Sequence, residues 1–157
     1  MEPVSVSRSI LTVNGGSSSI KFALFEASES PRRTLKGQIE RIGMPGPMFL
    51  VQAADGDESF SQSISAKDHK AAVAALMDWI KKRGQSDNLI AIGHRIVHGG
   101  PNFYEPQRVT PDLINELRQL IPLDPEHLPK EVLLAETFVH QFPQLPRFAC
   151  FDTAFHH

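Results

Sequence analysis

The stretch VNGGSSSIKFALFE, residues 13–26, joins two apolar segments through glycines and serines and then places a lysine. A simple β-hairpin needs only two or three turn residues, commonly Asn-Gly or Asp-Gly. This turn is longer, and its small donors fit phosphate oxygens: the backbone N–H groups of Gly15 and Gly16, and the hydroxyls of Ser17 to Ser19. Lys21 would add a positive charge nearby. A flexible polar turn explains the same composition, so both interpretations stand.

A second polar stretch is GHRIVHGG, residues 93–100. In an extended strand His94 and His98 share one face, while Arg95 and Val97 share the other. The two histidines would lie about 13 Å apart, at roughly 3.3 Å per residue, which is too far to bind one metal ion. Arg95 and Val97 pointing together into a cleft would suit a carboxylate with a short apolar tail. The alternative for Arg95 is a surface ion pair.

Three further residues are candidates for chemistry. Asp152 ends the apolar run RFACFD, and a buried ionised carboxylate requires a hydrogen-bonding or metal partner, although a turn-capping aspartate is the alternative. His127 lies in the proline-framed segment PLDPEHLP. Cys150, the single cysteine, has no basic neighbour in sequence to lower its thiol pKa, which predicts a small core residue and not a nucleophile.

The hydrophobic pattern predicts the elements that position these residues. Strands are expected over 7–14, 19–26, 34–43, 48–54, 59–65, 89–100 and 147–155. Helices are expected from near residue 66, from Thr110-Pro111 to about 121, and over 130–142. Ser65 and Asp68 have the spacing of a capping box for the first helix. The nearly continuous apolar residues of 147–155 predict a central strand.

Strands come first, and helices then alternate with strands. This order predicts an α/β domain whose mixed sheet has an antiparallel portion followed by crossover units. The chain stops immediately after its most apolar strand, whereas domains usually end at an exposed helix or loop. We therefore expect an N-terminal portion of something longer.

The composition excludes several classes of protein. The 157 residues suffice for one domain, and the net charge of −2, with no basic run longer than residues 81–83, disfavours a nucleic-acid partner. A single cysteine permits no internal disulfide and fits a reducing compartment. No stretch approaches the roughly 18 consecutive apolar residues of a membrane span. These features predict a cytoplasmic domain that contacts no membrane.

Together, VNGGSSSIKFALFE, GHRIVHGG and FDTAFH resemble the N-terminal domain of the acetate and propionate kinase family. The first matches the family's opening N-x-G-S-S-S-x-K pattern, and the others match its two further N-terminal signatures in the same order. The resemblance implies a ribonuclease H-like, actin-like lobe of the acetate and sugar kinase superfamily. Residues 1–157 would form this N-terminal lobe, and a C-terminal nucleotide-binding lobe would be absent from the chain. It also implies a homodimer for the full-length protein.

The resemblance assigns roles to individual positions. The phosphate-binding positions would be Asn14, Gly16, Ser17, Ser19 and Lys21. The catalytic residues would be Arg95, Asp152 and His127; Arg95 would also bind substrate with Val97 as a wall of the acyl pocket, and Asn14 and Asp152 would be associated with Mg²⁺.

The implied reaction is reversible transfer of a phosphoryl group from ATP to a short-chain carboxylate, giving an acyl phosphate and ADP. The isolated lobe would be incomplete and inactive. A non-catalytic phosphate- or carboxylate-binding domain of the same fold is the alternative. A nuclease of the related fold would need a carboxylate at the end of the first strand to help hold two metal ions, where this chain has Asn14.

One segment departs from the family pattern. The family reads P-L-A-P-L-H-N-P around the loop histidine, whereas this chain reads PLDPEHLP over 122–129. Glu126 replaces a leucine of the acetyl pocket, and Leu128 replaces an asparagine. A glutamate facing a substrate carboxylate would repel it. Either the acceptor differs from acetate, or the loop turns Glu126 to solvent.

Overall fold

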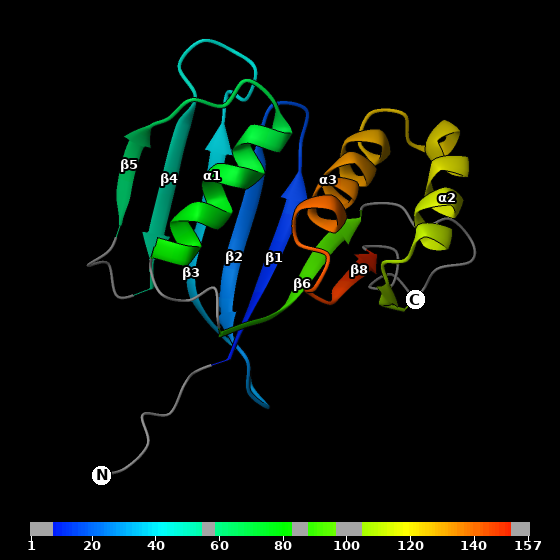
Figure 1. Cartoon of the computed structure of the whole chain (residues 1–157), viewed down its shortest axis with the longest axis horizontal. Helices are drawn as coiled ribbons and strands as arrows, with labels where there is room; N and C mark the ends of the chain where they lie inside the picture. The colour runs from blue at the N-terminus through cyan, green and yellow to red at the C-terminus, as the bar shows by residue number, and fades with distance from the viewer. Residues whose placement is uncertain (1–7, 55–58, 83–87, 97–104, 152–157) are drawn as a thin grey trace.

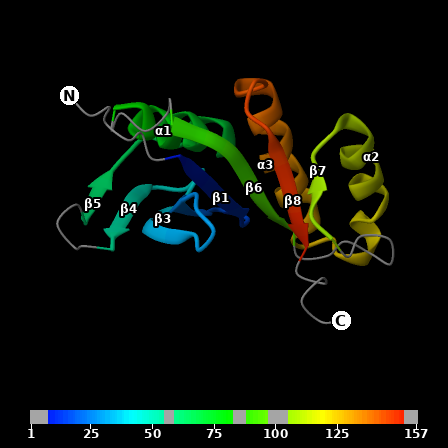
Figure 2. The same ribbon diagram turned by 90° about the horizontal axis from the view of Figure 1, so that it is seen from below.

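The computed structural model describes residues 8–54, 59–82, 88–96 and 105–151, which form a mixed sheet covered by helices (Figures 1 and 2). Its strands are β1 (Ser9–Gly15), β2 (Ile20–Glu26), β3 (Arg32–Glu40), β4 (Met48–Ala53), β5 (Phe60–Ser63), β6 (Leu89–Ile96), β7 (Gln107–Arg108) and β8 (Arg147–Phe151). Its helices are α1 (His69–Lys82), α2 (Pro111–Gln119), the short 3₁₀ helix η3 (Ile121–Leu123) and α3 (Leu128–Gln141).

The strand order in the sheet is β5-β4-β3-β2-β1-β6-β8-β7. Strands β1 to β5 form an antiparallel meander, in which each strand pairs with the next along the chain. Strand β6 then pairs in parallel with β1, and β8 pairs in parallel with β6. Because parallel neighbours need crossover connections, helices lie between these strands in the sequence. The predicted mixed α/β sheet is confirmed.

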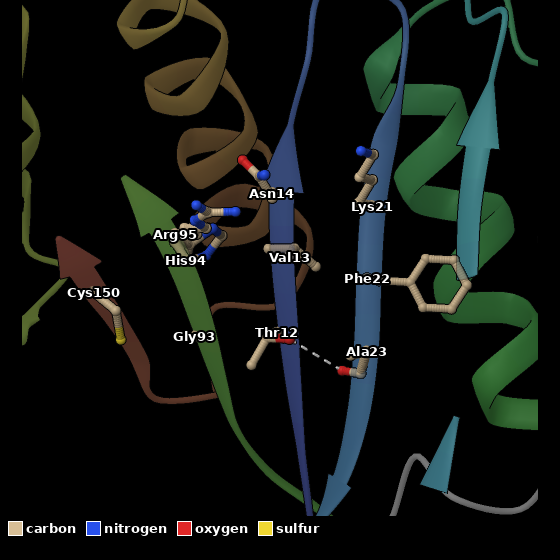
Figure 3. Close-up of a pocket in the computed structure, with 10 residues that line it drawn as sticks. All are labelled: Thr12, Val13, Asn14, Lys21, Phe22, Ala23, Gly93, His94, Arg95 and Cys150. Atoms are coloured by element: carbon tan, nitrogen blue, oxygen red, sulfur yellow. Dashed lines mark hydrogen bonds between the residues drawn. The ribbon is translucent and has the colours of Figure 1, made fainter. Parts of the chain in front are cut away.

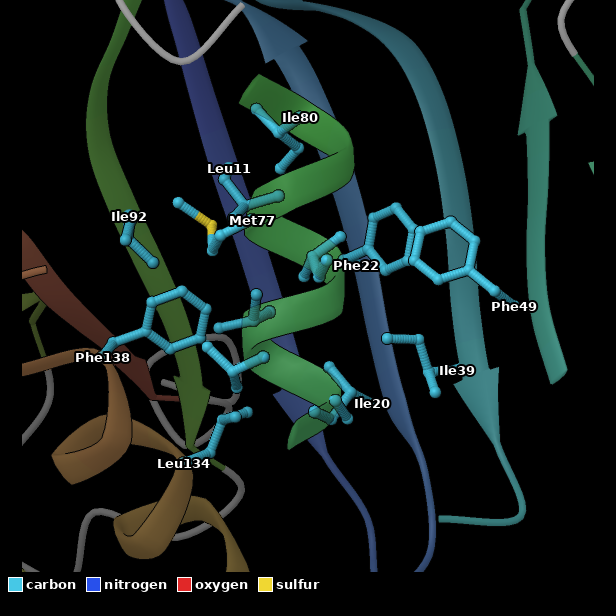
Figure 4. Packing of buried hydrophobic residues seen from close by; sticks show 14 of the residues in the cluster. Leu11, Ile20, Phe22, Ile39, Phe49, Met77, Ile80, Ile92, Leu134 and Phe138 are labelled. Atoms are coloured by element: carbon cyan, nitrogen blue, oxygen red, sulfur yellow. The ribbon is translucent and has the colours of Figure 1, made fainter. Parts of the chain in front are cut away.

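Alternation along the strands directs one set of side chains toward the helices. Leu11 on β1 lies opposite Leu24 on one side and Ile92 on the other, and all three are fully buried. Helix α1 packs its apolar stripe on this face, and α3 adds Leu134 and Phe138 (Figure 4). A second cluster joins α2, α3 and β8 around residues that include Leu117. Apolar burial of this kind is the main force that holds helices on a sheet.

Side-chain caps mark the starts of α1 and α2. Asp68 Oδ1 accepts a hydrogen bond from Ala71 N at 2.8 Å, so Asp68 caps α1 and the helix begins at His69. The predicted start near residue 66, with Ser65 in a capping box, was therefore wrong by one turn. Thr110 caps α2 as the Thr-Pro pair predicted, since its hydroxyl accepts from Leu113 N at 3.1 Å. No helix in the described ranges is long and apolar enough to cross a membrane.

Strand β8 is not central, contrary to the prediction from its apolar run. It lies one position from the sheet edge, and its outer neighbour β7 has only two residues. The apolar residues of β8 serve two different faces: Ala149 and Phe151 are buried, whereas Phe148 is 37% exposed. The residues predicted to extend this strand, 152–155, lie outside the described ranges, as do 97–100 beyond β6.

In the meander, an aromatic ring occupies the space beside a glycine. Gly37 on β3 lies opposite Phe22 on β2, and the Phe22 ring is 5.7 Å from that of Phe49. A Cβ built on Gly37 would overlap the carbonyl oxygen of Leu50 and lie 2.5 Å from Cζ of Phe22. The position therefore has no room for any side chain.

We expect Gly37→Ala to lower the free energy of unfolding by about 2 kcal/mol or more, because neither a ladder carbonyl nor a packed ring can move without cost. Gly93→Ala is the matched control, since a Cβ there meets Thr12 Cγ2 at an ordinary 3.6 Å. Urea denaturation of both variants measures the difference. Equal stability of the two would contradict this account of the meander.

Candidate functional site

Four side chains form one row across the sheet on the face that the helices leave uncovered. Asn14 on β1 pairs with Lys21 on β2, and Arg95 on β6 pairs with Cys150 on β8. Val13 pairs with the residue before Arg95, so Asn14 and Arg95 stand level on neighbouring parallel strands. The row lies near the carboxyl ends of the three parallel strands, where ligands bind in open α/β sheets.

Small residues in the next row create the space in front of these side chains. Thr12 on β1 lies between Ala23 on β2 and Gly93 on β6. The Thr12 hydroxyl is directed to the Ala23 carbonyl oxygen at 3.4 Å, which keeps it against the sheet (Figure 3). The resulting cavity has a volume of about 730 Å³ and is lined by both rows. Its size falls in the range of small-molecule sites.

Two cationic side chains line the cavity. Lys21 and Arg95 line it, and none of its described lining residues is an aspartate or glutamate. In Figure 3 the side chains of Asn14 and Lys21 extend toward the carboxyl end of β1, and Arg95 lies on the neighbouring strand β6. Two cations and an amide that line one cavity favour an anion, and an arginine fork matches a carboxylate or phosphate with two hydrogen bonds.

His94 points to the opposite face from Arg95, as the strand alternation predicted. It is buried with 1% exposure, and its ring packs edge-on to Phe138 at 5.3 Å. Neither ring nitrogen has a hydrogen-bond partner within the described part of the chain. Burial, together with the nearby charge of Arg147, lowers the pKa of His94 to about 3, so the ring is neutral.

The spacing of His94 and His98 along an extended strand predicts no shared metal ion. His98 lies outside the described ranges. Across those ranges no group of three or more His, Cys, Asp or Glu residues is arranged to hold a metal ion.

The loop between β1 and β2 adjoins this row at the same end of the sheet. Its Gly16 N–H donates to Ser19 O at 2.8 Å, so this N–H is not free for an anion, contrary to the expectation from the sequence. Ser17 is exposed, and Ser18 and Ser19 are half-buried. Gly15 packs against the first turns of α3, where an added Cβ would lie 3.4 Å from Lys130 O.

His127 immediately precedes α3 and does not line the cavity. Its Nδ1 lies 3.1 Å from Asp124 Oδ1, which also accepts from the His127 backbone N–H at 3.2 Å. Glu126 is exposed, and this supports the alternative in which the loop turns it to solvent. Leu128 is fully buried in the α2–α3–β8 cluster, so the leucine in place of the family's asparagine is a core residue.

The structure thus brings together three of the residues singled out in the sequence: Asn14, Lys21 and Arg95. Val97 and Asp152 lie outside the described ranges. Cys150, expected in the core, is half-buried and lines the cavity instead, because its strand pairs it with Arg95. Burial raises the pKa of its thiol, which agrees with the expectation that it is not a nucleophile.

The lining residues Thr12, Ala23 and Gly93 were not singled out in the sequence. The pairings of β1 with β2 and with β6 show that these small residues lie side by side on three strands.

An antiparallel meander continued by helix-linked parallel strands, with a cationic cavity at the carboxyl ends, defines an actin-like lobe of the acetate and sugar kinase superfamily. A propionate kinase from Francisella tularensis matches 95% of the chain with a TM-score of 0.87 and 31% identity. Porphyromonas gingivalis acetate kinase matches 95% of it with a TM-score of 0.86 and 28% identity. The chain covers 38% of each of these solved structures.

The chain belongs to the acetokinase family, whose family model matches residues 9–157. An acetate kinase from Rhodopseudomonas palustris is 41% identical over 152 residues, which are 94% of this chain and 38% of that protein. The chain therefore spans somewhat more than a third of the length of such relatives.

The buried His94 makes stability depend on pH. Its pKa is about 3 in the folded chain against 6.5 for a free histidine, so below pH 6.5 the unfolded chain binds a proton that the folded chain does not. His94 therefore does not reduce the free energy of unfolding above pH 6.5. Below that pH, the free energy of unfolding falls by up to about 1.4 kcal/mol per pH unit as the pH falls toward 3.

We expect His94→Leu to remove this part of the pH dependence, measured as the free energy of unfolding between pH 7.5 and 4.5. The exposed His140→Gln is the control and should keep the wild-type slope. A His94→Leu variant with an unchanged slope would show that His94 is not held neutral.

Proposed function

We propose that this chain forms the acceptor side of a kinase that reversibly transfers a phosphoryl group from ATP to a short-chain carboxylate, giving an acyl phosphate and ADP. The observation that carries the proposal is the row of Lys21, Asn14 and Arg95 in a cavity whose described lining has no carboxylate. Membership of the acetokinase family supports the choice of reaction.

Arg95 and Lys21 have different roles in the proposed reaction because their side chains differ in shape and charge distribution. The planar Arg95 guanidinium binds two oxygens of a carboxylate or acyl phosphate at once and holds the acceptor in line. Lys21 places a compact positive charge next to the Gly-Ser loop, where the transferring phosphate would lie. Since phosphoryl transfer needs little covalent help from the protein, positioning and charge stabilisation supply most of the rate acceleration. No side-chain nucleophile is required for direct transfer.

The proposal includes Mg²⁺, which when bound neutralises charge on the phosphate oxygens. Magnesium in proteins is usually held by one or two carboxylates together with substrate phosphates. Asn14 presents an amide to the cavity, and the described lining offers no carboxylate. The proposal therefore assigns the carboxylate to Asp152, which directly follows β8 in the sequence. Val97 as a wall of the acyl pocket and His127 as a catalytic residue remain parts of the same proposal.

We assign the adenosine site and dimer formation to the remainder of the whole protein, because the relatives are more than twice as long as this chain. The 157 residues alone would then form no acyl phosphate. A cytoplasmic location agrees with the single cysteine.

We expect Arg95→Ala to lower kcat/KM for the carboxylate by about 100-fold or more, the usual effect of removing one oxyanion-stabilising donor. Arg95→Lys should recover only part of it, because a lysine lacks the planar fork. The measurement is hydroxamate-trapped acyl phosphate formation by this chain completed with the remaining portion of the Rhodopseudomonas palustris enzyme.

Arg33→Ala, an exposed arginine on β3, is the matched control and should retain activity. An active Arg95→Ala variant would contradict the assigned role of this arginine. A completed protein that binds phosphate but turns over no carboxylate would favour the non-catalytic binding domain instead.

The exposure of Glu126 gives a separate expectation for acceptor choice. Because its side chain is exposed and does not line the cavity, Glu126→Leu should change the ratio of acetate to propionate turnover by less than about twofold. Glu126→Gln, which removes only the charge, is measured beside it in the same assay. A tenfold rise in acetate turnover in Glu126→Leu would show that Glu126 selects the acceptor.

A further inference from the structure

Two carbonyl groups of the β1–β2 loop are held by residues outside the loop. His69 Nε2 lies 2.9 Å from Gly16 O, across 53 residues of sequence. Ile42 N donates to Ser18 O at 2.8 Å. A carbonyl oxygen only accepts hydrogen bonds, so His69 Nε2 must carry the proton in this contact.

The planarity of the peptide bond extends these contacts to the neighbouring N–H groups. No peptide bond in the described ranges is cis, and in a trans peptide the C=O and the following N–H point in opposite directions. Fixing Gly16 O toward His69 therefore turns Ser17 N–H away from His69. Fixing Ser18 O toward Ile42 N turns Ser19 N–H away in the same manner.

The direction of these N–H groups follows from where the two anchors lie. His69 begins α1 on the helix-covered face of the sheet, and Ile42 is buried in the core on that face. The N–H groups of Ser17 and Ser19 are thereby turned away from His69 and from the Ile42 backbone. Neither N–H donates to another residue within the described part of the chain.

Hydrogen bonds hold the backbone around His69. Asp68 caps α1 through Ala71 N, and Ala72 N bonds Asp68 O at 3.1 Å, so the backbone on both sides of His69 is fixed. The residue after Ile42, Gly43, donates to Ala66 O at 2.8 Å and so ties the second anchor to the segment that leads into α1. A single unit therefore carries both contacts to the loop.

We propose that His69 is a positioning residue: its hydrogen bond to Gly16 O presents the N–H groups of Ser17 and Ser19 to an anion on the Asn14–Lys21 face. The choice of a phosphoryl group as this anion rests on the proposed function. Backbone N–H groups that point into one space can bind an anion together, because each carries a partial positive charge. The loop would lose this arrangement without its anchor, even though His69 itself touches no substrate.

The test uses the 157-residue chain and its backbone amide NMR spectrum. Amide exchange at Gly16 reports the closure of the loop, and titration with inorganic phosphate reports anion binding through the Ser17 and Ser19 signals. In His69→Asn the shorter amide cannot reach Gly16 O, whereas the Gln Nε2 in His69→Gln reaches about as far as the imidazole Nε2. Lys70→Ala, an exposed neighbour in the same helical turn, is the control.

We expect Gly16 exchange to accelerate and phosphate affinity to fall about 10-fold each in His69→Asn, the factor that one net hydrogen bond is worth. His69→Gln should stay within about twofold of wild type, and Lys70→Ala should be unchanged. If the substitutions only destabilise the fold, Gly16 exchange and phosphate affinity should change equally in both His69 variants. Thermal melts of each variant would also detect the destabilisation.

Wild-type exchange and affinity in His69→Asn would overturn the proposal, and so would a His69→Gln variant as impaired as His69→Asn. If the wild-type chain binds no phosphate, the proposed role of the β1–β2 loop in phosphate binding is wrong. Gly16 exchange in the same spectra then still decides whether His69 positions the loop.

Discussion

The alternation of side chains along β1 is the constraint on which both the core and the candidate site depend. Leu11 and Val13 are buried against the helices, while Thr12 and Asn14 line the cavity on the other face. A shift of one residue in the pairing of β1 would exchange these two sets. The burial of apolar side chains on the helix-covered face fixes the register. The positions of the polar side chains on the other face therefore depend on packing in which they take no part.

Strand β6 shows how closely the two environments adjoin. His94 and Arg95 are consecutive, yet one ring is buried and neutral while the next side chain is exposed and cationic. The two environments suit the two side chains. The imidazole can be buried because it can lose its charge, whereas a guanidinium cannot and must face solvent or an anion. The same division separates Leu128, which anchors α3 in the core, from the exposed Glu126 two residues before it.

Much of this arrangement could be predicted from the sequence, because strand faces and helix caps are local properties. Period-two alternation predicted that His94 and Arg95 lie on opposite faces of β6, and Thr110 marked the start of α2. Contacts between distant segments could not be predicted in this way. The His69–Gly16 bond spans 53 residues, and the half-buried place of Cys150 follows from β8 pairing with β6 near the edge of the sheet. Nothing in the local pattern of either segment indicates its partner.

The pairing of β1 also orders the events of folding. Leu11 meets Leu24 through a short hairpin, but it meets Ile92 only after the meander and α1 have been traversed. Contacts between residues far apart in sequence form slowly, because closing a long loop loses chain entropy before any packing compensates for it. Lys21 and Asn14 can therefore adopt their places early, whereas Arg95 joins them only when β6 docks. The cavity is complete only after β6 has paired with β1, so a chain still being synthesised holds only half of it.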